Sequence, residues 1–315
     1  MTLSTKQRRA TAVILPALIG LGGAYFAARV FGSYGWALFL GIPVLVSFVS
    51  SLIYRRTGAA SWGSCYGVSL LSILVLGGLI LLFAIDGLIC LVMALPLAAA
   101  LGLIGSTLGY ILGKRLSSGI ARALPIIFVC VLPLLMAFES QRPIKPQLHE
   151  VTTRIAVAAP IQVVWDEVIA FDRIQAPPTG IFQLGIAYPI QATIKGEGVG
   201  AIRHCIFSTG PFIEPITRWD APRTLEFDVT ANPPPMKEFS PWGHLDAPHL
   251  HNTFTSEHGR FQLFEEGGKT ILQGTTWYRQ TISPDFYWHT ISDHIIHLIH
   301  LRVLEHIKMK AEQNG

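Results

Sequence analysis

The sequence predicts an α-helical membrane bundle of about five spans in residues 1–138, a linker in 139–148 and an α+β domain in 149–315. Long apolar runs fill the first part, and crossing a bilayer core takes about 20 helical residues. Short runs of alternating apolar and polar residues fill most of the second part. That part ends in a stretch of about 28 residues without proline or glycine, which is typical of a sheet followed by one long helix.

Charge divides the chain at the same place. Residues 1–148 hold 11 Lys and Arg but only two acids, Asp86 and Glu139, whereas residues 149–315 hold 13 basic and 18 acidic side chains. The overall charge of +4 is therefore +9 in the first part and −5 in the second. Because the basic residues flank apolar runs and form no stripe with interleaved aromatic residues, we expect no nucleic-acid partner.

Five apolar runs are predicted to cross a membrane, at roughly 11–31, 34–54, 66–85, 88–112 and 120–138. Pro125 and Pro133 interrupt the last run, and spans tolerate proline where neighbouring helices satisfy the backbone. A cleaved signal peptide is the alternative for the first run. That run is longer than a typical signal core, however, and no small-residue cleavage site follows it.

Basic residues predict the orientation of the bundle. A five-span model places eight on one side, namely Lys6, Arg8, Arg9, Arg55, Arg56, Lys114, Arg115 and Arg122. The other side holds Arg29, Arg142 and Lys145. Since basic loops stay in the cytoplasm, we expect a cytoplasmic N-terminus and a periplasmic or extracellular C-terminal domain. If 120–138 does not cross, that domain is cytoplasmic.

Small residues recur in the fourth run, where Gly105, Gly109 and Gly113 are spaced by four. This spacing allows close helix packing, so we expect a contact within the bundle, with a seam between two copies as the alternative. Apart from Asp86, which we place in a turn, the runs contain neither carboxylates nor histidines. An anchoring bundle is therefore favoured over a channel or pump.

The second part begins with strand periodicity, because Val151, Thr153, Ile155 and Val157 share one face. A short amphipathic helix led by Pro160 follows, then a second short helix or an irregular bend in 171–185. Further strands are predicted near 191–195, 200–208, 212–219, 223–230, 253–264 and 270–281, and one amphipathic helix near 284–312. A proline-rich insertion, 232–252, separates two of these strands.

Four segments of residues 149–312 resemble the SRPBCC, or START-like, superfamily of polyketide cyclase/dehydrase and lipid-transport domains. They are VAAPIQVVWDEV, ITRWDAPRTLEFDV, GGKTILQGTTW and the closing helix. The resemblance implies a helix-grip fold, in which a curled antiparallel sheet surrounds the C-terminal helix and leaves an apolar cavity. The insertion is longer than a usual hairpin of this family, so the shape of the cavity mouth is expected to differ from that of the family.

The insertion holds the first candidate site, formed by His244, Asp246, His249 and His251. Imidazole and carboxylate groups at this spacing are plausible zinc or copper ligands. No standard metal signature is matched, so we favour a surface lid loop with solvated histidines and expect no bound cofactor. Phe239, Pro241 and Trp242 suit an apolar flap over a pocket or against a bilayer.

The last helix holds the second candidate, because His289, Asp293, His297 and His300 fall on one stripe. Facing a cavity, Asp293 would orient His297 as a general base. The alternative that we favour is the solvent-facing polar side of an amphipathic helix.

Aromatic residues are the third signal. Most are expected in the core, and some must line any cavity of this fold. With His300, the candidate ligand-binding residues are Trp165, Phe207, Trp219, Phe227, Phe261 and Trp277. Arg203, Arg218 and Arg279 suit an acidic ligand head, although arginine on a strand is more often solvated.

Together these patterns favour a membrane-anchored protein that holds a lipid or another hydrophobic small molecule in a START-like domain. A cyclase, dehydratase or hydrolase acting on an apolar substrate is one alternative. A membrane protein with a structural or signalling role is another.

Overall fold

The computed structural model describes residues 5–56, 60–115, 118–141, 146–251 and 253–315. The chain forms two compact units. The first comprises 1–144, 238–249 and 282–284, and the second comprises 145–237, 250–281 and 285–315. Part of the predicted linker lies outside the described residues, as do Arg142 and Lys145, on which the predicted orientation partly rests.

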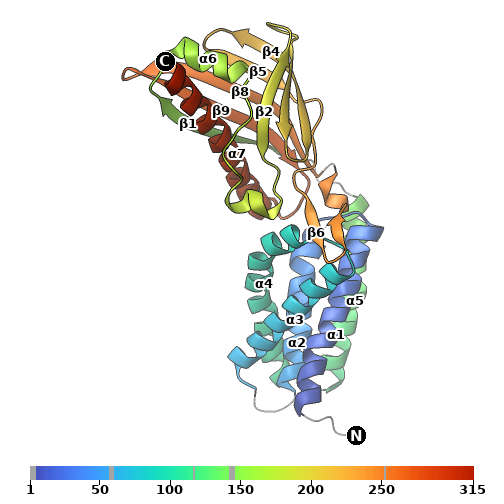
Figure 1. Ribbon diagram of the computed structural model, residues 1–315. Helices are drawn as coiled ribbons and strands as arrows, with labels where there is room; N and C mark the ends of the chain where they lie inside the picture. The colour runs from blue at the N-terminus through green and yellow to red at the C-terminus, as the bar shows by residue number, and fades with distance from the viewer. Residues whose placement is uncertain (1–4, 57–59, 116–117, 142–145, 252) are drawn as a thin grey trace. The chain divides into compact units, whose positions relative to one another are not determined.

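Long helices lying side by side form the first unit (Figure 1). They are α1 (Thr5–Tyr25) with the π-helical turn η1 (Phe26–Val30), α2 (Ile42–Arg55) preceded by the π-helical turn η2 (Ala37–Gly41), α3 (Trp62–Leu82), α4 (Leu88–Arg115) and α5 (Ser118–Gln141). Five helical segments in the described part are long and apolar enough to cross a membrane. The prediction of five apolar helices is therefore confirmed.

Helix α2 is the most buried of these helices and packs through small residues. The buried hydroxyl of Ser51 donates a hydrogen bond to the carbonyl oxygen of Ser106 (2.8 Å). The predicted glycine face of α4 lies directly against α2, because a Cβ at Gly105 or Gly109 would collide with a carbonyl oxygen of α2. The contact within the bundle is thus present. The alternative, a seam between two copies through this face, stays a prediction.

A short hairpin from the proline-rich insertion belongs to the first unit. Its strands are β6 (Glu238–Ser240) and β7 (Gly243–Leu245), and the 3-10 turn η4 (Pro248–Leu250) follows. The indole Nε1 of Trp242, at the hairpin tip, donates a hydrogen bond to the carbonyl oxygen of Leu82 at the end of α3 (2.7 Å). The sequence predicted a surface lid loop here, with an apolar flap over a pocket or against a bilayer, inside a domain of residues 149–315; the hairpin belongs to the helical unit instead.

The second unit is built on one antiparallel seven-stranded sheet of order β1-β9-β8-β5-β4-β3-β2. The strands are β1 (Leu148–Val157), β2 (Pro189–Lys195), β3 (Ile202–Phe207), β4 (Gly210–Asp220), β5 (Thr224–Asp228), β8 (Phe254–Glu266) and β9 (Lys269–Gln280). Each matches a strand predicted from alternation. In β5, for example, Leu225 and Phe227 are buried, as expected for one face against a core.

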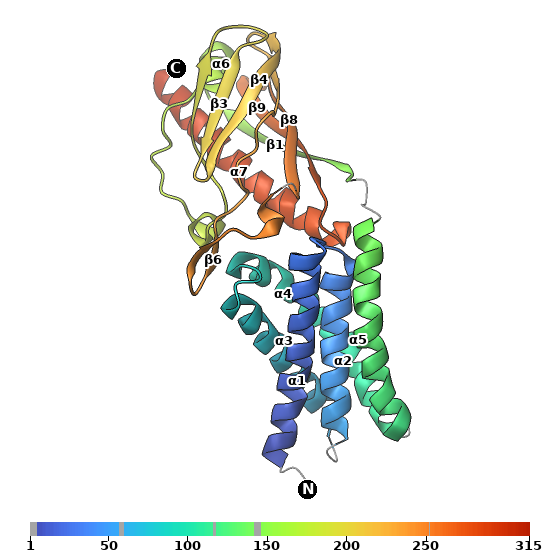
Figure 2. The same ribbon diagram turned by 90° about the vertical axis from the view of Figure 1, so that its right-hand side faces the viewer.

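Helix α7 (Asp285–Asn314) runs along one face of the curled sheet, and α6 (Ile161–Ile169) packs near its C-terminal end (Figure 1, Figure 2). The 3-10 turn η3 (Gly180–Leu184) lies where a second short helix or an irregular bend was predicted. The core between sheet and helices includes Trp165, Leu225 and Leu304. This arrangement is a helix-grip fold, as predicted.

Candidate functional site

The turn between α3 and α4 carries a buried carboxylate, Asp86. This side chain is 7% exposed, and its Oδ1 accepts a hydrogen bond from the backbone N–H of Gly87 (2.8 Å). Burial raises the pKa of Asp86 to about 6, while the N–H of Gly87, the thiol of Cys90 and the positive charge of Arg29 act in the opposite direction. A carboxyl group that titrates near neutrality in a buried turn marks a candidate functional site.

Glu238 reaches this turn from the hairpin. Its carboxylate accepts hydrogen bonds from the backbone N–H groups of Ile89 (2.9 Å) and Cys90 (2.8 Å). The first N–H groups of a helix have no partner within the helix, so Glu238 completes the N-terminus of α4. A Cβ on Gly87 would occupy the same space as the Glu238 side chain. Glycine is therefore the residue that permits this approach.

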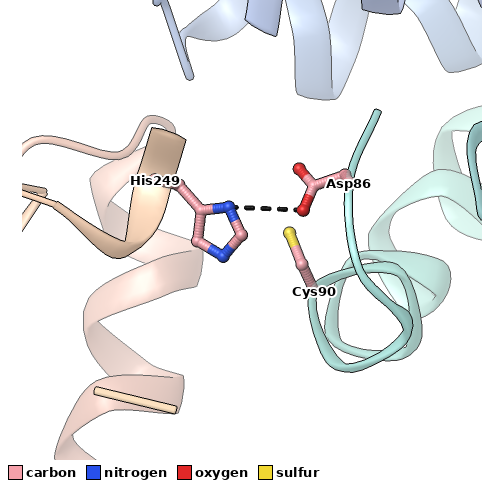
Figure 3. Close-up of side chains that lie close together, drawn as sticks. All are labelled: Asp86, Cys90 and His249. Carbon is pink, nitrogen blue, oxygen red and sulfur yellow. Dashed lines mark ion pairs between the residues drawn. The ribbon is translucent and has the colours of Figure 1, made fainter. Parts of the chain in front are cut away.

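His249 lies between the two carboxylates. Its Nδ1 is 3.2 Å from Asp86 Oδ1, and its Nε2 is 3.7 Å from Glu238 Oε1. Figure 3 shows the imidazole directed at Asp86, with the sulfur of Cys90 beside both. The donor atoms of Asp86, Cys90 and His249 lie within 4.8 Å of one another, and all three residues are buried. We call Asp86, Cys90, Glu238 and His249 the Asp86 cluster.

Tyr34, between η1 and η2, contacts the cluster through His249. Its ring meets that of His249 edge to face, with 5.3 Å between the ring centroids. Burial, together with the negative charge of Asp86, raises the pKa of the Tyr34 hydroxyl, and burial likewise raises the pKa of Glu238. Buried carboxyl, thiol, imidazole and phenol groups at one place can hold a cation or pass a proton.

An apolar cavity of about 270 Å³, which we call the bundle cavity, lies next to this cluster. Helices α1, α2, α3 and α4 line it with alanine, leucine, isoleucine and glycine, and the polar residues of its lining are Asp86 and Cys90. Leu74 and Val92, also in the lining, are about half exposed. The bundle cavity is therefore a hydrophobic pocket with polar groups at Asp86 and Cys90.

The proline-rich insertion contributes Glu238 and His249 to this site, and only His249 was among its predicted candidates. His249 is buried beside Asp86, whereas His244, Asp246 and His251 are exposed on their segments. The ring of His244 lies tilted against that of Phe239, with ring centroids 5.1 Å apart. Reasoning from the sequence grouped these four as metal ligands or solvated lid residues, and missed Asp86, Cys90 and Glu238. One available signal was Asp86, the only carboxylate between two apolar runs.

The polar stripe of α7 faces the sheet, so the expectation of a solvated helix face is wrong. Asp293 Oδ1 accepts a hydrogen bond from the Tyr278 hydroxyl (2.6 Å). His297 Nδ1 pairs with the hydroxyl of Thr153 (2.8 Å). His300 Nδ1 also lies 3.1 Å from this hydroxyl, and its Nε2 pairs with that of Thr276 (2.8 Å). Asp293 and His297 thus each bond to a strand residue.

Burial lowers the pKa of His300 to about 4 from its usual 6.5. Between pH 6.5 and pH 4 the unfolded chain binds a proton that the folded chain does not. The free energy of unfolding therefore falls as the pH is lowered through this window. We expect His300→Asn to reduce the acid-induced loss of stability in the second unit, because the replacement does not titrate. Hydrogen exchange of β9 amides from pH 7 to pH 4 measures this.

The control is His294→Asn on the exposed side of α7, which should keep the wild-type pH profile. Identical pH profiles for His300→Asn and the wild type would show that His300 does not cause the acid sensitivity.

The aromatic candidates lie mainly in the core of the second unit. Trp165 and Phe227 are buried, and Phe207, Trp219 and Phe261 pack against them. Trp165 and Trp219 meet edge to face, with centroids 5.8 Å apart. Trp277 stacks under the guanidinium of Arg260 at 4.9 Å and donates a hydrogen bond to Glu150 (3.0 Å). It follows Thr276 in β9, so it points to the sheet face opposite α7.

The three strand arginines have different environments. Arg203 is 1% exposed and pairs with the buried carboxylate of Glu214, which corrects the expectation of a solvated residue. Its guanidinium also lies 5.6 Å from the ring centroids of Phe227 and Phe261. Arg218 and Arg279, in contrast, form more exposed pairs with acids of the same sheet.

Fold and site together define a class: five long apolar helices with a buried acid, thiol and imidazole cluster, joined in one chain to a helix-grip domain. No family model matches the sequence, and no curated protein matches it.

Solved structures similar to this chain include norcoclaurine synthase from Thalictrum flavum in complex with dopamine and hydroxybenzaldehyde (10% identity, 54% of this chain, 90% of that chain, TM-score 0.35). Others are a protein from Nitrosospira multiformis (15% identity, 53% of this chain, 100% of that chain, TM-score 0.34) and the Aha1 dimer from Colwellia psychrerythraea (16% identity, 49% of this chain, 93% of that chain, TM-score 0.28).

Proposed function

We propose that this protein is a multi-pass membrane protein that binds a lipid or another hydrophobic small molecule in the bundle cavity. The observation that carries the proposal is the cavity itself, which combines apolar walls with Asp86 and Cys90 at one place. Pockets with mostly apolar linings and a few polar groups are typical of small-molecule sites. The proposed ligand class is the one expected from the sequence, but the site that we propose for it lies in the first unit, whereas the sequence pointed to the second.

Surface composition supports the membrane part of the proposal. Large apolar side chains are exposed along the helices of the first unit, among them Ile14, Leu71, Ile104 and Ile126. So much exposed apolar surface is unusual for a water-soluble protein and suits contact with lipid tails. The cytoplasmic N-terminus and the external second unit remain proposals based on the basic loops. An enzymatic reporter fused to the C-terminus, active on one side only, tests this placement.

Filling the bundle cavity should abolish binding. Gly77 on α3 lines the cavity, and a Cβ built on it meets no atom within 4 Å. Gly77→Phe would place its ring in this space without a backbone clash. We expect labelling by a photoactivatable fatty acid to fall about tenfold, equivalent to about 1.4 kcal/mol of binding free energy. The purified chain is labelled in detergent, and labelled peptides and co-purifying lipids are quantified by mass spectrometry.

The matched control is Gly67→Phe on the same helix. A Cβ at Gly67 also meets no atom within 4 Å, and Gly67 is outside the cavity lining. Labelling of this control should equal that of the wild type. Equal labelling of both variants, or labels confined to peptides of the second unit, would contradict binding in the bundle cavity.

A further inference from the structure

Three side chains of different chemistry converge in the first unit at the polar end of the bundle cavity. The turn before α4 supplies the Asp86 carboxylate, the first turn of α4 supplies the Cys90 thiol, and the segment after β7 supplies the His249 imidazole (Figure 3). Their exposed fractions are 7%, 6% and 4%. Water therefore has little access to these donor atoms, so the interactions among them are strong.

The spacing of the donor atoms suits a small metal ion. Zinc bonds of about 2.0–2.3 Å in a tetrahedral set place donor atoms roughly 3.3–3.8 Å apart. Here His249 Nδ1 and Asp86 Oδ1 are 3.2 Å apart, and all three donor atoms lie within 4.8 Å of one another. Small side-chain adjustments would therefore be enough to bring the three donors around one ion.

The surrounding groups have the form of an outer ligand shell. With Nδ1 directed at the metal position, Nε2 of His249 points to Glu238 Oε1 at 3.7 Å. Metal-binding histidines commonly direct the second ring nitrogen at a carboxylate, which holds the ring orientation and tautomer. Glu238 is itself held by the N–H groups of Ile89 and Cys90. The imidazole is thus positioned by a carboxylate that α4 holds in place.

Charge also favours a cation at this point. Asp86 and Glu238 are two buried carboxylates close enough to repel each other, and uncompensated buried charge is costly. A divalent ion with one thiolate ligand carries a net charge of about +1 and so offsets part of this negative charge. Thiolate and imidazole ligands together favour zinc over magnesium or calcium, which prefer oxygen ligands only.

We propose that Asp86, Cys90 and His249 bind one zinc ion, with Glu238 orienting His249. The fourth tetrahedral position is open to water or to a polar group of a molecule in the bundle cavity. Through His249, the ion ties the segment 238–249 to the start of α4. Because the donors are far apart in the sequence, metal binding contributes directly to the stability of this fold.

The test uses the full chain purified in detergent, stripped with a chelator and incubated with zinc or cobalt ions alone. We expect one zinc ion per chain after desalting, and a sulfur-to-cobalt charge-transfer band in the wild type, which reports thiolate ligation. Cys90→Ser should abolish the band, and Asp86→Asn and His249→Gln should each weaken zinc affinity at least tenfold. Zinc should raise the thermal midpoint of the wild type and leave that of Cys90→Ser unchanged.

Two control variants address other ligand sets. His244→Gln alters an exposed histidine of the hairpin, and His289→Gln alters a second, half-exposed group formed with His149 and Asp285. Both should retain one zinc ion and the cobalt band. Wild-type protein that binds no zinc, or that gives no charge-transfer band with bound cobalt, would overturn the proposal whatever the stability of the variants. Equal zinc content in Cys90→Ser and the wild type would overturn it as well.

Discussion

Glu214→Gln is expected to destabilise the second unit by about 3–5 kcal/mol, because it leaves the charge of Arg203 buried without its partner. Arg203 and Glu214 are 1% and 6% exposed. The guanidinium Nε also donates a hydrogen bond to the carbonyl oxygen of Ile169 (3.2 Å). Hydrogen exchange of peptides from 202–228 under increasing urea measures the loss.

The double variant Arg203→Met/Glu214→Leu distinguishes the cost of an unpaired buried charge from the cost of altered packing. It removes both charges, so we expect most of the lost stability to return, as in other buried pairs replaced by apolar residues. Arg218→Gln is the exposed control, since its guanidinium is more than half exposed in its pair with Asp220, and should cost less than about 1 kcal/mol. A loss in Glu214→Gln as small as that of the control would contradict the account.

Gly109→Leu is expected to disrupt the packing of α4 on α2 and to cost about 3 kcal/mol, near the upper end for overpacked sites. A Cβ at Gly109 would lie 2.5 Å from the carbonyl oxygen of Phe48 and 2.8 Å from Cβ of Ser51. Backbone cannot move aside as a side-chain end can, so the helices must separate. The fraction of monodisperse protein after heating in detergent, measured by size-exclusion chromatography, reports the change.

Two further substitutions calibrate this result. Gly113→Ala meets the flexible side chain of Arg55 at 3.1 Å, which can shift, so its effect should be small. Gly67→Leu on α3 faces open space and should behave as the wild type. If Gly67→Leu lowered the fraction of monodisperse protein as much as Gly109→Leu, the loss would come from helix propensity or added apolar surface. The contact between α4 and α2 would then not be its cause.

Local periodicity explains why so much of the fold was predictable. The apolar runs are about as long as a helix needs to be to cross a bilayer, and five such helices are present in the described residues. Alternation in segments such as Leu225–Phe227 determines which side chains face a core, and both residues are buried. Pro284 followed by an uninterrupted amphipathic run predicted α7, which spans Asp285–Asn314. Each of these signals lies within one segment of the chain.

The candidate site was predictable only in part, because its residues come from distant segments. His249 was singled out for its histidine neighbours, yet its contact is with Asp86. Glu238 completes the N-terminus of α4 across 149 residues of sequence, measured from Ile89. Nothing in the sequence around Glu238 indicates a partner in an apolar helix. The same holds for Arg203, whose strand position suggested solvent and whose partner Glu214 lies on the adjacent strand.

The sequence by itself determined the five apolar helices and the order of strands and closing helix, since hydrophobic spacing and turn residues act over short distances. Tertiary structure decided which polar groups share a buried space: that the polar stripe of α7 faces β1 and β9, and that the Asp86 cluster forms beside the bundle cavity. The physical reason is that a buried polar group needs a partner, and the choice among distant partners depends on how the packed elements bring them together.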